Sequence, residues 1–336
     1  MKLHALCWPL LLLGTLAQAQ VPREGVEFSH KDWDLVCFRT GTCVAMGYSA
    51  GDSLDGISLA LNRQAGPRTP FSANLLFADL AGDPPTSPVS LVLDDELVGS
   101  ATEHGPRDFV LDEYASRRLV DALAGNTRIR FVDALGHAWP LSGAGATAAL
   151  LKMDELQERL GTPSAAVRRG DEDEDLVPGP ERASPPISHP PLVDTRLVDA
   201  RLADDPALRQ ALASALSPHQ PCPDLHAGPL VIERLDEHRL LVSTQCAANS
   251  YNTATGFWVA EDRPPYLARL VTEAGSRFDR ARATLASWQM QSPRGDCMKR
   301  AFWTWDGTRF VLTYRAGYVR CRGFRDGAWT VPSYVN

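Results

Sequence analysis

Apolar and polar residues alternate with a period of two over several short segments in the first half of the chain. Trp33, Leu35 and Cys37 occupy alternate positions, and the segment DGISLALNR repeats the same pattern. The segment SPVSLVLDDELVGS contains two short apolar runs around an acidic turn. Because successive side chains of a β-strand point to opposite faces of a sheet, this pattern predicts strands with one buried face.

The period changes to that of a helix in two later segments. DEYASRRLVDALAGN predicts a helix from Asp112 to the Gly125-Asn126 stop. SGAGATAALLKMDELQERLG predicts a second helix that ends at Gly161, with its apolar residues within a stripe about 120° wide. The residues of this stripe are Ala146, Ala149, Leu150, Met153, Leu156 and Leu160.

The second half of the chain combines one helix with aromatic strands. Asp205 is a suitable helix cap, and Pro206 follows it at the first helical position. VIERLDEHRLLVSTQC and RAFWTWDGTRFVLTY each read as strand, turn and strand, and Asp306-Gly307 is typical of a type I′ turn. The sequence therefore predicts an α+β, mainly β protein: two disulfide-tied antiparallel β modules with a few helices, joined by an acidic, Pro-rich linker.

The predicted linker covers residues 171–198. It begins with DEDED and continues with LVPGPERASPPISHPPL, which has six prolines and no apolar periodicity. Such a composition favours a solvated, semi-extended chain. We therefore predict an N-terminal β-sandwich-like domain with helices at 20–170 and a Trp-rich β domain at 199–336.

Neither of two candidate metal sites has a suitable ligand set. Acidic residues alternate in DEDED as in an EF-hand, but Leu176 stands at the glycine position and Arg182 at the last ligand position. His219, Cys222 and His226 offer three ligands, one of them a cysteine that we expect to be oxidised. We predict no metal and no cofactor.

Residues 1–19 read as a secretory signal peptide. Lys2 precedes an apolar run over residues 5–16, and Ala17-Gln18-Ala19 follows as a cleavage site, so the mature chain is expected to begin near Gln20 in the periplasm. The run is shorter than the roughly 20 residues that a membrane span requires. No membrane span is predicted.

Six cysteines remain after cleavage, and an even number in an exported protein indicates disulfides. Six cysteines allow 15 pairings, and local spacing favours one short ring and two rings that each enclose 23 residues. Each larger ring is expected to add roughly 3.5 kcal/mol to the free energy of unfolding, and the short ring about 2.3 kcal/mol. The predicted pairs are Cys37 with Cys43, Cys222 with Cys246, and Cys297 with Cys321.

The net charge argues against a nucleic-acid partner. The whole chain has a formal net charge of −7, and loss of Lys2 makes the mature chain slightly more acidic. Residues 292–336 depart from this balance with eight basic and three acidic side chains. We predict that this segment binds an anionic envelope component. The candidate binding residues are Arg315, Arg320, Arg322 and Trp329. In the alternative interpretation, the arginines pair with acids from neighbouring strands or from the linker.

The segment GYSAG, residues 47–51, has the G-x-S-x-G spelling of a hydrolase nucleophile elbow around Ser49. Such an elbow requires a strand before the serine and a helix after it, whereas here the alternating segment DGISLALNR predicts a strand. Histidines that could complete a catalytic triad occur at positions 104, 137, 226 and 238. With so many candidates, the presence of a histidine does not strengthen the hydrolase interpretation. We therefore interpret GYSAG as a turn, and a serine hydrolase that uses Ser49 stays the alternative function.

Four segments carry a resemblance to a known family: KDWDLVCFRTGTCVAMGYS, LSGAGATAALLKMDELQERLGTPSAAVRRG, QCAANSYNTATGFW and GDCMKRAFWTWDGTRFVL with a later CRG. Together they resemble a bacterial exported family with six cysteines, catalogued as domain of unknown function 1176. The first half is also similar to invasion-associated locus B proteins, which are periplasmic β-sandwich modules without an established catalytic activity. The resemblance implies an exported protein with a six-cysteine framework, and it supplies no catalytic residue. Because the sequence also has no coherent catalytic set, we predict a non-catalytic envelope protein that binds an unknown partner or ligand or supports envelope integrity. Gln291-Ser292-Pro293-Arg294 stands where the family leads one to expect glycines.

Overall fold

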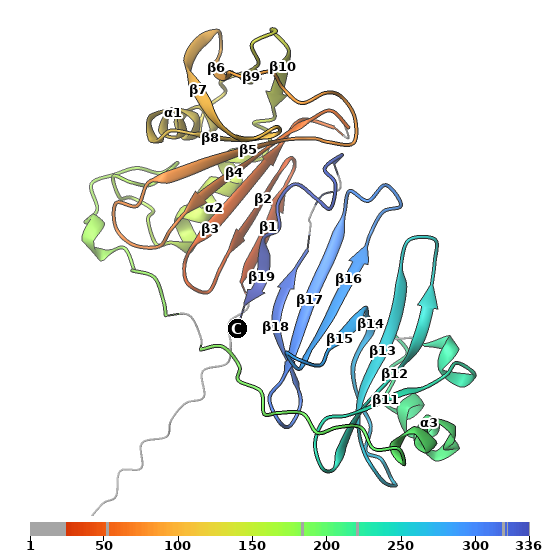
Figure 1. Cartoon of the computed structure of the whole chain (residues 1–336). Coiled ribbons are helices and arrows are strands. Elements are labelled where there is room, and N and C mark those ends of the chain that lie inside the picture. Colours follow the sequence, from red (N-terminus) through yellow and green to blue (C-terminus); the bar gives the residue numbers. More distant parts are fainter. Residues whose placement is uncertain are drawn as a thin grey trace, which may run out of the picture.

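The first half of the chain forms a ten-stranded antiparallel sheet (Figure 1). The computed structural model describes residues 25–51, 54–182, 185–219, 222–317, 320 and 322–335, and the predicted signal peptide lies outside them. The strands follow the order β1-β2-β3-β4-β5-β8-β7-β6-β9-β10 across the sheet. Their bounds are β1 (Val26–His30), β2 (Trp33–Cys37), β3 (Cys43–Tyr48), β4 (Ile57–Arg63), β5 (Phe71–Phe77), β6 (Val89–Leu93), β7 (Glu96–Gly105), β8 (Asp108–Leu111), β9 (Ile129–Val132) and β10 (Ala138–Leu141).

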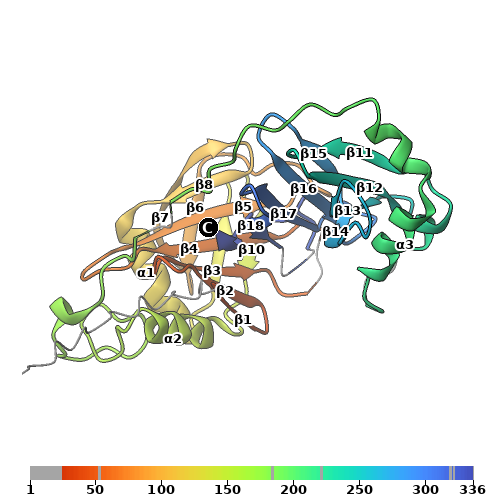
Figure 2. The ribbon, with the colours of Figure 1, turned by 90° about the horizontal axis from the view of Figure 1, so that it is seen from below.

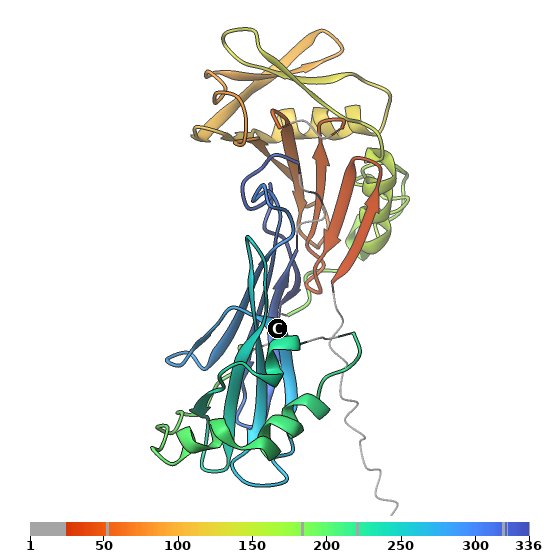
Figure 3. The same cartoon turned by 90° about the vertical axis from the view of Figure 1, so that its right-hand side faces the viewer.

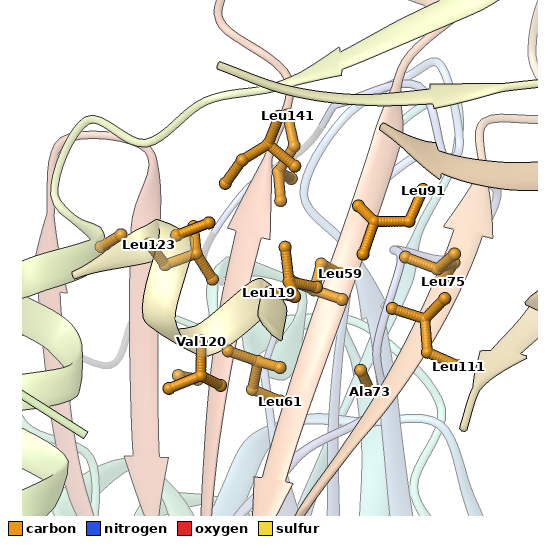
Figure 4. Packing of buried hydrophobic residues seen from close by; sticks show 14 of the residues in the cluster. Leu59, Leu61, Ala73, Leu75, Leu91, Leu111, Leu119, Val120, Leu123 and Leu141 are labelled. Atoms are coloured by element: carbon orange, nitrogen blue, oxygen red, sulfur yellow. The ribbon is translucent and has the colours of Figure 1, made fainter. Parts of the chain in front are cut away.

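Two helices cover one face of this sheet (Figures 2 and 3). Helix α1 (Glu113–Leu123) begins after Asp112, whose carboxylate accepts a hydrogen bond from the backbone N–H of Ala115 at 2.7 Å. Helix α2 (Ala146–Leu156) ends before the predicted Gly161, because Glu158 leaves the helical region with a φ of 55°. Both predicted helices are confirmed, and their apolar sides meet the strand side chains in one core. Figure 4 shows Leu119, Val120 and Leu123 of α1 in this core.

The second half contains two smaller antiparallel sheets, in the orders β11-β12-β13-β14 and β15-β16-β17-β18-β19. Helix α3 (Pro206–Ser214) packs on the first of them and has the predicted cap at Asp205. The strand bounds are β11 (Val231–Arg234), β12 (Arg239–Ala248), β13 (Thr253–Glu261), β14 (Arg269–Gly275), β15 (Arg277–Asp279), β16 (Thr284–Met290), β17 (Met298–Trp305), β18 (Phe310–Ala316) and β19 (Pro332–Val335). The predicted α+β, mainly antiparallel β fold is confirmed.

A second core joins these two sheets. Leu241 and Phe257 from the first sheet pack with Leu285 and Trp305 from the second. Gly275 makes the passage from β14 to β15 possible, because a Cβ atom at this position would lie 2.5 Å from the Phe257 ring.

Two of the predicted disulfides are present, Cys37–Cys43 and Cys222–Cys246. Cys297 is also disulfide-bonded. Its predicted partner, Cys321, lies outside the described residues, so that pairing stays a prediction. The hairpin β17-β18 lies between these two positions, as expected.

The turn of this hairpin differs from the predicted type I′ turn around Asp306-Gly307. That type requires a positive φ at both central residues, whereas only Gly307 of the predicted pair has one, at 98°. Asp306 instead closes the turn with its carboxylate, which accepts hydrogen bonds from the backbone N–H groups of Thr308 and Arg309 at 2.7 and 2.9 Å.

The acidic start of the linker is docked through Glu174, whereas the other four residues of DEDED are exposed. The 3-10 helix η1 (Glu174–Leu176) brings the Glu174 carboxylate into a buried ion pair with Arg159, with 3.2 Å between Oε1 and Nη1. Arg159 is itself fully buried and donates hydrogen bonds to Gln157 and Thr69. A buried guanidinium needs a carboxylate, and the linker supplies it. Two further 3-10 helices, η2 (Asp199–Asp204) and η3 (Pro223–His226), precede and follow α3. The domain boundaries at 170 and 198 stay a prediction.

The C-terminal segment, which we define as residues 320–331, returns to the first sheet. Phe324 and Val331 pack against Val36, Val44 and Met46 on the face of β2–β4 opposite the helices (Figure 3). No helix in the described part of the chain is long and apolar enough to span a bilayer.

Candidate binding cleft

The Ser49 hydroxyl is committed to two backbone hydrogen bonds. Its Oγ donates to the carbonyl of Pro140 and accepts from the N–H of Ile57, both at 3.0 Å. The segment after it is strand β4, as the sequence predicts, and not the helix that a nucleophile elbow requires. These contacts pin the turn to β10 and give the serine a structural role.

The histidines nominated for a triad have other surroundings. His137 lies 3.4 Å from the carboxylate of Asp133, and its ring contacts Trp139. Within the described residues, no three His, Cys, Asp or Glu side chains converge in a way that would hold a metal ion.

The four predicted binding residues occupy two different environments. Arg320 donates from Nε to Asp34 at 2.8 Å, and Arg322 donates from Nη2 to Asp32 at 2.9 Å. Both arginines therefore fasten the C-terminal segment to the first sheet. Arg315 and Trp329 lie elsewhere, in the lining of a cleft of about 930 Å³ between the two halves of the chain.

One wall of the cleft is a face of the sheet β16-β17-β18. Lys299 of β17 pairs directly with Gln289 of β16, and Ala301 pairs with Arg315 of β18. Directly paired residues project to the same face of an antiparallel sheet, and residues two apart on one strand do so as well. Lys299, Gln289 and Arg315 therefore share this wall, and Trp303 adds an aromatic ring to it.

The opposite wall comes from β2 and β3 and is mostly apolar. Val36, Met46 and Tyr48 line it, and Trp329 of the C-terminal segment lies beside them. The indole N–H of Trp329 donates to the hydroxyl of Ser58 at 2.8 Å. This bond satisfies the polar end of the ring and fixes its position in the wall.

Charges of both signs face the cleft. Lys299, Arg300 and Arg315 are its cations on the β17-β18 side, and Glu27 and Glu273 are its carboxylates. Burial raises the pKa of the Tyr48 phenol far above its ordinary value, and the nearby negative charge of Asp34 raises it further. Tyr48 therefore stays neutral, and the guanidinium of Arg322 lies over its ring at 5.6 Å.

Comparison with known proteins places the chain in a family. Residues 27–336 match the model of DUF1176, described as "Protein of unknown function". The chain belongs to the DUF1176 family. A relative, the "Uncharacterized protein YpfG" of Escherichia coli (strain K12), is 25% identical over 320 residues, which cover 86% of this chain and 87% of YpfG. No solved structure matches the chain. The similarity of the first half to invasion-associated locus B proteins stays a prediction.

Sequence patterns identify only part of the cleft of this DUF1176 protein. Arg315 and Trp329 stand out through the basic and aromatic character of the last 45 residues. Lys299 and Trp303 carry a local signal as well, since both lie on one face of a predicted strand. Glu27 and Tyr48 carry no sequence signal that assigns them to the cleft, because they lie opposite β17 only after the C-terminal segment has returned to the first sheet.

Proposed function

We propose that this protein is an exported, non-catalytic binding protein of the bacterial periplasm, and that its cleft takes a carboxylate-bearing fragment of the cell wall. The observation that carries the proposal is the composition of the cleft, in which the cations Lys299 and Arg315 line the same space as the rings of Trp303 and Trp329. Its volume of about 930 Å³ is within the usual range for sites that bind small ligands.

A cell-wall fragment presents the groups that this lining can bind. Its carboxylates match the guanidinium of Arg315 and the ammonium of Lys299. Its amide and ammonium groups are donors for Glu27 and Glu273, and the flat faces of its sugars match the tryptophan rings. A purely anionic ligand would place further negative charge beside the two carboxylates of the cleft.

An extracytoplasmic compartment is supported by the cysteines. Cys37–Cys43 and Cys222–Cys246 are disulfides, which persist in oxidising compartments and are rare in the cytosol. These bonds, together with the predicted signal peptide, support the periplasm as the compartment in this proposal.

The double variant Lys299→Ala with Arg315→Ala tests the cleft. We expect it to bind isolated, solubilised cell-wall fragments about tenfold or more weakly than the wild type, because it removes two charge-assisted contacts. Isothermal titration calorimetry at low and moderate salt measures this loss, and wild-type affinity should fall as ionic strength rises.

Arg309→Ala is the matched control, since Arg309 is an exposed arginine on the same hairpin that pairs with Asp306 outside the cleft. It should bind as the wild type does. Equal affinity of the double variant and the wild type would remove the cleft from consideration.

A fluorophosphonate probe tests the hydrolase alternative. We expect no labelling that depends on Ser49, because its hydroxyl is held between two backbone groups. Gel fluorescence of the oxidised protein measures this. Labelling that disappears in Ser49→Ala would overturn the non-catalytic proposal.

A further inference from the structure

We propose a second binding site, in the first half of the chain, for a small organic ligand that carries clustered phosphate groups. The site is a pocket of about 640 Å³ between the end of β4, helix α1 and the loop that follows α2. Four arginines from three stretches of the sequence line it: Arg63 and Arg68, Arg117, and Arg169. Glu113 and Glu174 are the carboxylates of the lining.

Arg63 forms the fixed floor of this pocket and is only 2% exposed. Its Nε donates to the carbonyl of Thr69 at 3.2 Å, and its Nη2 donates to the carbonyl of Ser164 at 2.6 Å. Its guanidinium also lies 4.5 Å from the centre of the Phe71 ring. A guanidinium held in this way is already oriented before a ligand arrives.

The floor belongs to a buried cluster of two guanidiniums and two carboxylates, in which Arg63 pairs with Asp154 and Arg159 pairs with Glu174. The nearest carboxylate to Arg63 is that of Asp154, at 3.5 Å, and Asp154 also accepts the backbone N–H groups of Ala166 and Val167 at 3.0 Å. Burial and the neighbouring charge of Arg159 together lower the pKa of Arg63 to about 10, against the opposing effect of the carboxylates of Asp154 and Glu174. An anion in the pocket would relieve this repulsion.

The other three arginines form the rim and are 50–70% exposed. Arg117 pairs with Glu113 at 3.1 Å. Arg169 and Arg68 pair with Asp121 and Asp175, which are not part of the pocket lining. Exposed ion pairs of this kind contribute little to stability, so a multiply charged anion can exchange for these carboxylates. The carboxylate of Glu174 is already engaged, by Arg159 and Ser164.

The geometry favours phosphate over carboxylate, and an organic ligand over a bare ion. Guanidinium groups that approach from several directions suit a tetrahedral phosphate, whose oxygens point to all sides, better than a planar carboxylate. Phe71, Pro70, Pro163 and Val120 form an apolar side of the same pocket. The volume exceeds what a diphosphate alone would fill, and this side is where the organic part would lie.

Inorganic pyrophosphate serves as the probe, with thermal unfolding of the full-length oxidised protein as the readout. We expect a saturable rise in melting temperature for the wild type, measured against sodium chloride at equal ionic strength. The triple variant Arg68→Ala, Arg117→Ala, Arg169→Ala should bind pyrophosphate about tenfold or more weakly. The single variant Arg117→Gln, on the exposed side of α1, should show a smaller loss in the same direction.

Arg128→Ala is the matched control, because Arg128 is 71% exposed and pairs with Asp94 and Asp95 at the β6-β7 turn. Its response should equal that of the wild type. Three results would overturn the site: no stabilisation of the wild type at millimolar pyrophosphate, an unchanged response in both the triple variant and Arg117→Gln, or stabilisation by citrate without stabilisation by pyrophosphate. Arg315 lies outside this pocket, so the outcome is independent of the cleft experiment.

Discussion

The variant Arg320→Ala is expected to lower the free energy of unfolding by about 3–5 kcal/mol, because it leaves the buried carboxylate of Asp34 without its ion-pair partner. Asp34 is completely buried on β2. Its Oδ2 accepts from Arg320 at 2.8 Å, and its Oδ1 has no hydrogen-bond partner within the described residues. Removing the guanidinium therefore leaves both oxygens without a partner in an apolar setting. Urea denaturation of the oxidised protein measures the change.

Arg325→Ala provides the comparison. Arg325 belongs to the same C-terminal segment as Arg320, is 66% exposed, and pairs with Asp79. It should cost less than about 1 kcal/mol. The double variant Asp34→Leu with Arg320→Leu should recover much of the loss, because an apolar pair needs no hydrogen bonds. If Arg320→Ala is no more destabilising than Arg325→Ala, the pair is not a structural anchor.

Acid should weaken the fold through Glu174. Burial raises the pKa of this carboxyl, but hydrogen bonds from the Ser164 hydroxyl and from the backbone N–H groups of Arg68 and Ser164 outweigh burial and hold it at about 2. The folded-state pKa is lower than the unfolded value of 4.5. The contribution is therefore present above pH 4.5 and disappears as the pH falls toward 2. A shift of this size corresponds to about 3 kcal/mol.

Urea denaturation at a series of pH values measures this effect. The variant Glu174→Gln should be less stable than the wild type at pH 7 and should show a flatter decline in stability below pH 4.5. Asp171→Asn, three residues earlier on an exposed position, should follow the wild-type curve. Parallel wild-type and Glu174→Gln curves would show that another carboxylate governs acid unfolding.

Local chemistry explains which elements the sequence predicts. Asp205 and Pro206 determine the start of α3 within two residues, and Asp112 does the same for α1. The alternation of Trp33, Leu35 and Cys37 identifies β2, and near neighbours in sequence form the Cys37–Cys43 bridge. In each case the deciding contact lies within one element or one turn, so composition and spacing are sufficient.

Contacts between distant segments explain what the sequence does not predict. The expected solvation of DEDED fails at Glu174 because Arg159 needs a buried carboxylate, and that need is visible only once the fold exists. The arginines of the C-terminal segment read as one basic surface. Asp32 and Asp34, almost 300 residues earlier, instead take up two of them. Likewise, no short motif joins the four arginines of the pocket beneath α1, because only Arg63 and Arg68 are close in sequence.

The return of the C-terminal segment to β2–β4 sets an order for biogenesis. A chain emerges from its N-terminus, so the first sheet is complete long before the residues that cover its outer face have been made. During that interval the apolar side chains of the outer face, Val36, Val44 and Met46, are exposed to water. The Asp34 carboxylate has not yet formed its ion pair with Arg320. The newly made first half is thus a sheet with helices on one face and exposed apolar side chains on the other. Its exposed apolar face can associate with other chains until the C-terminal segment of its own chain has been made and covers it.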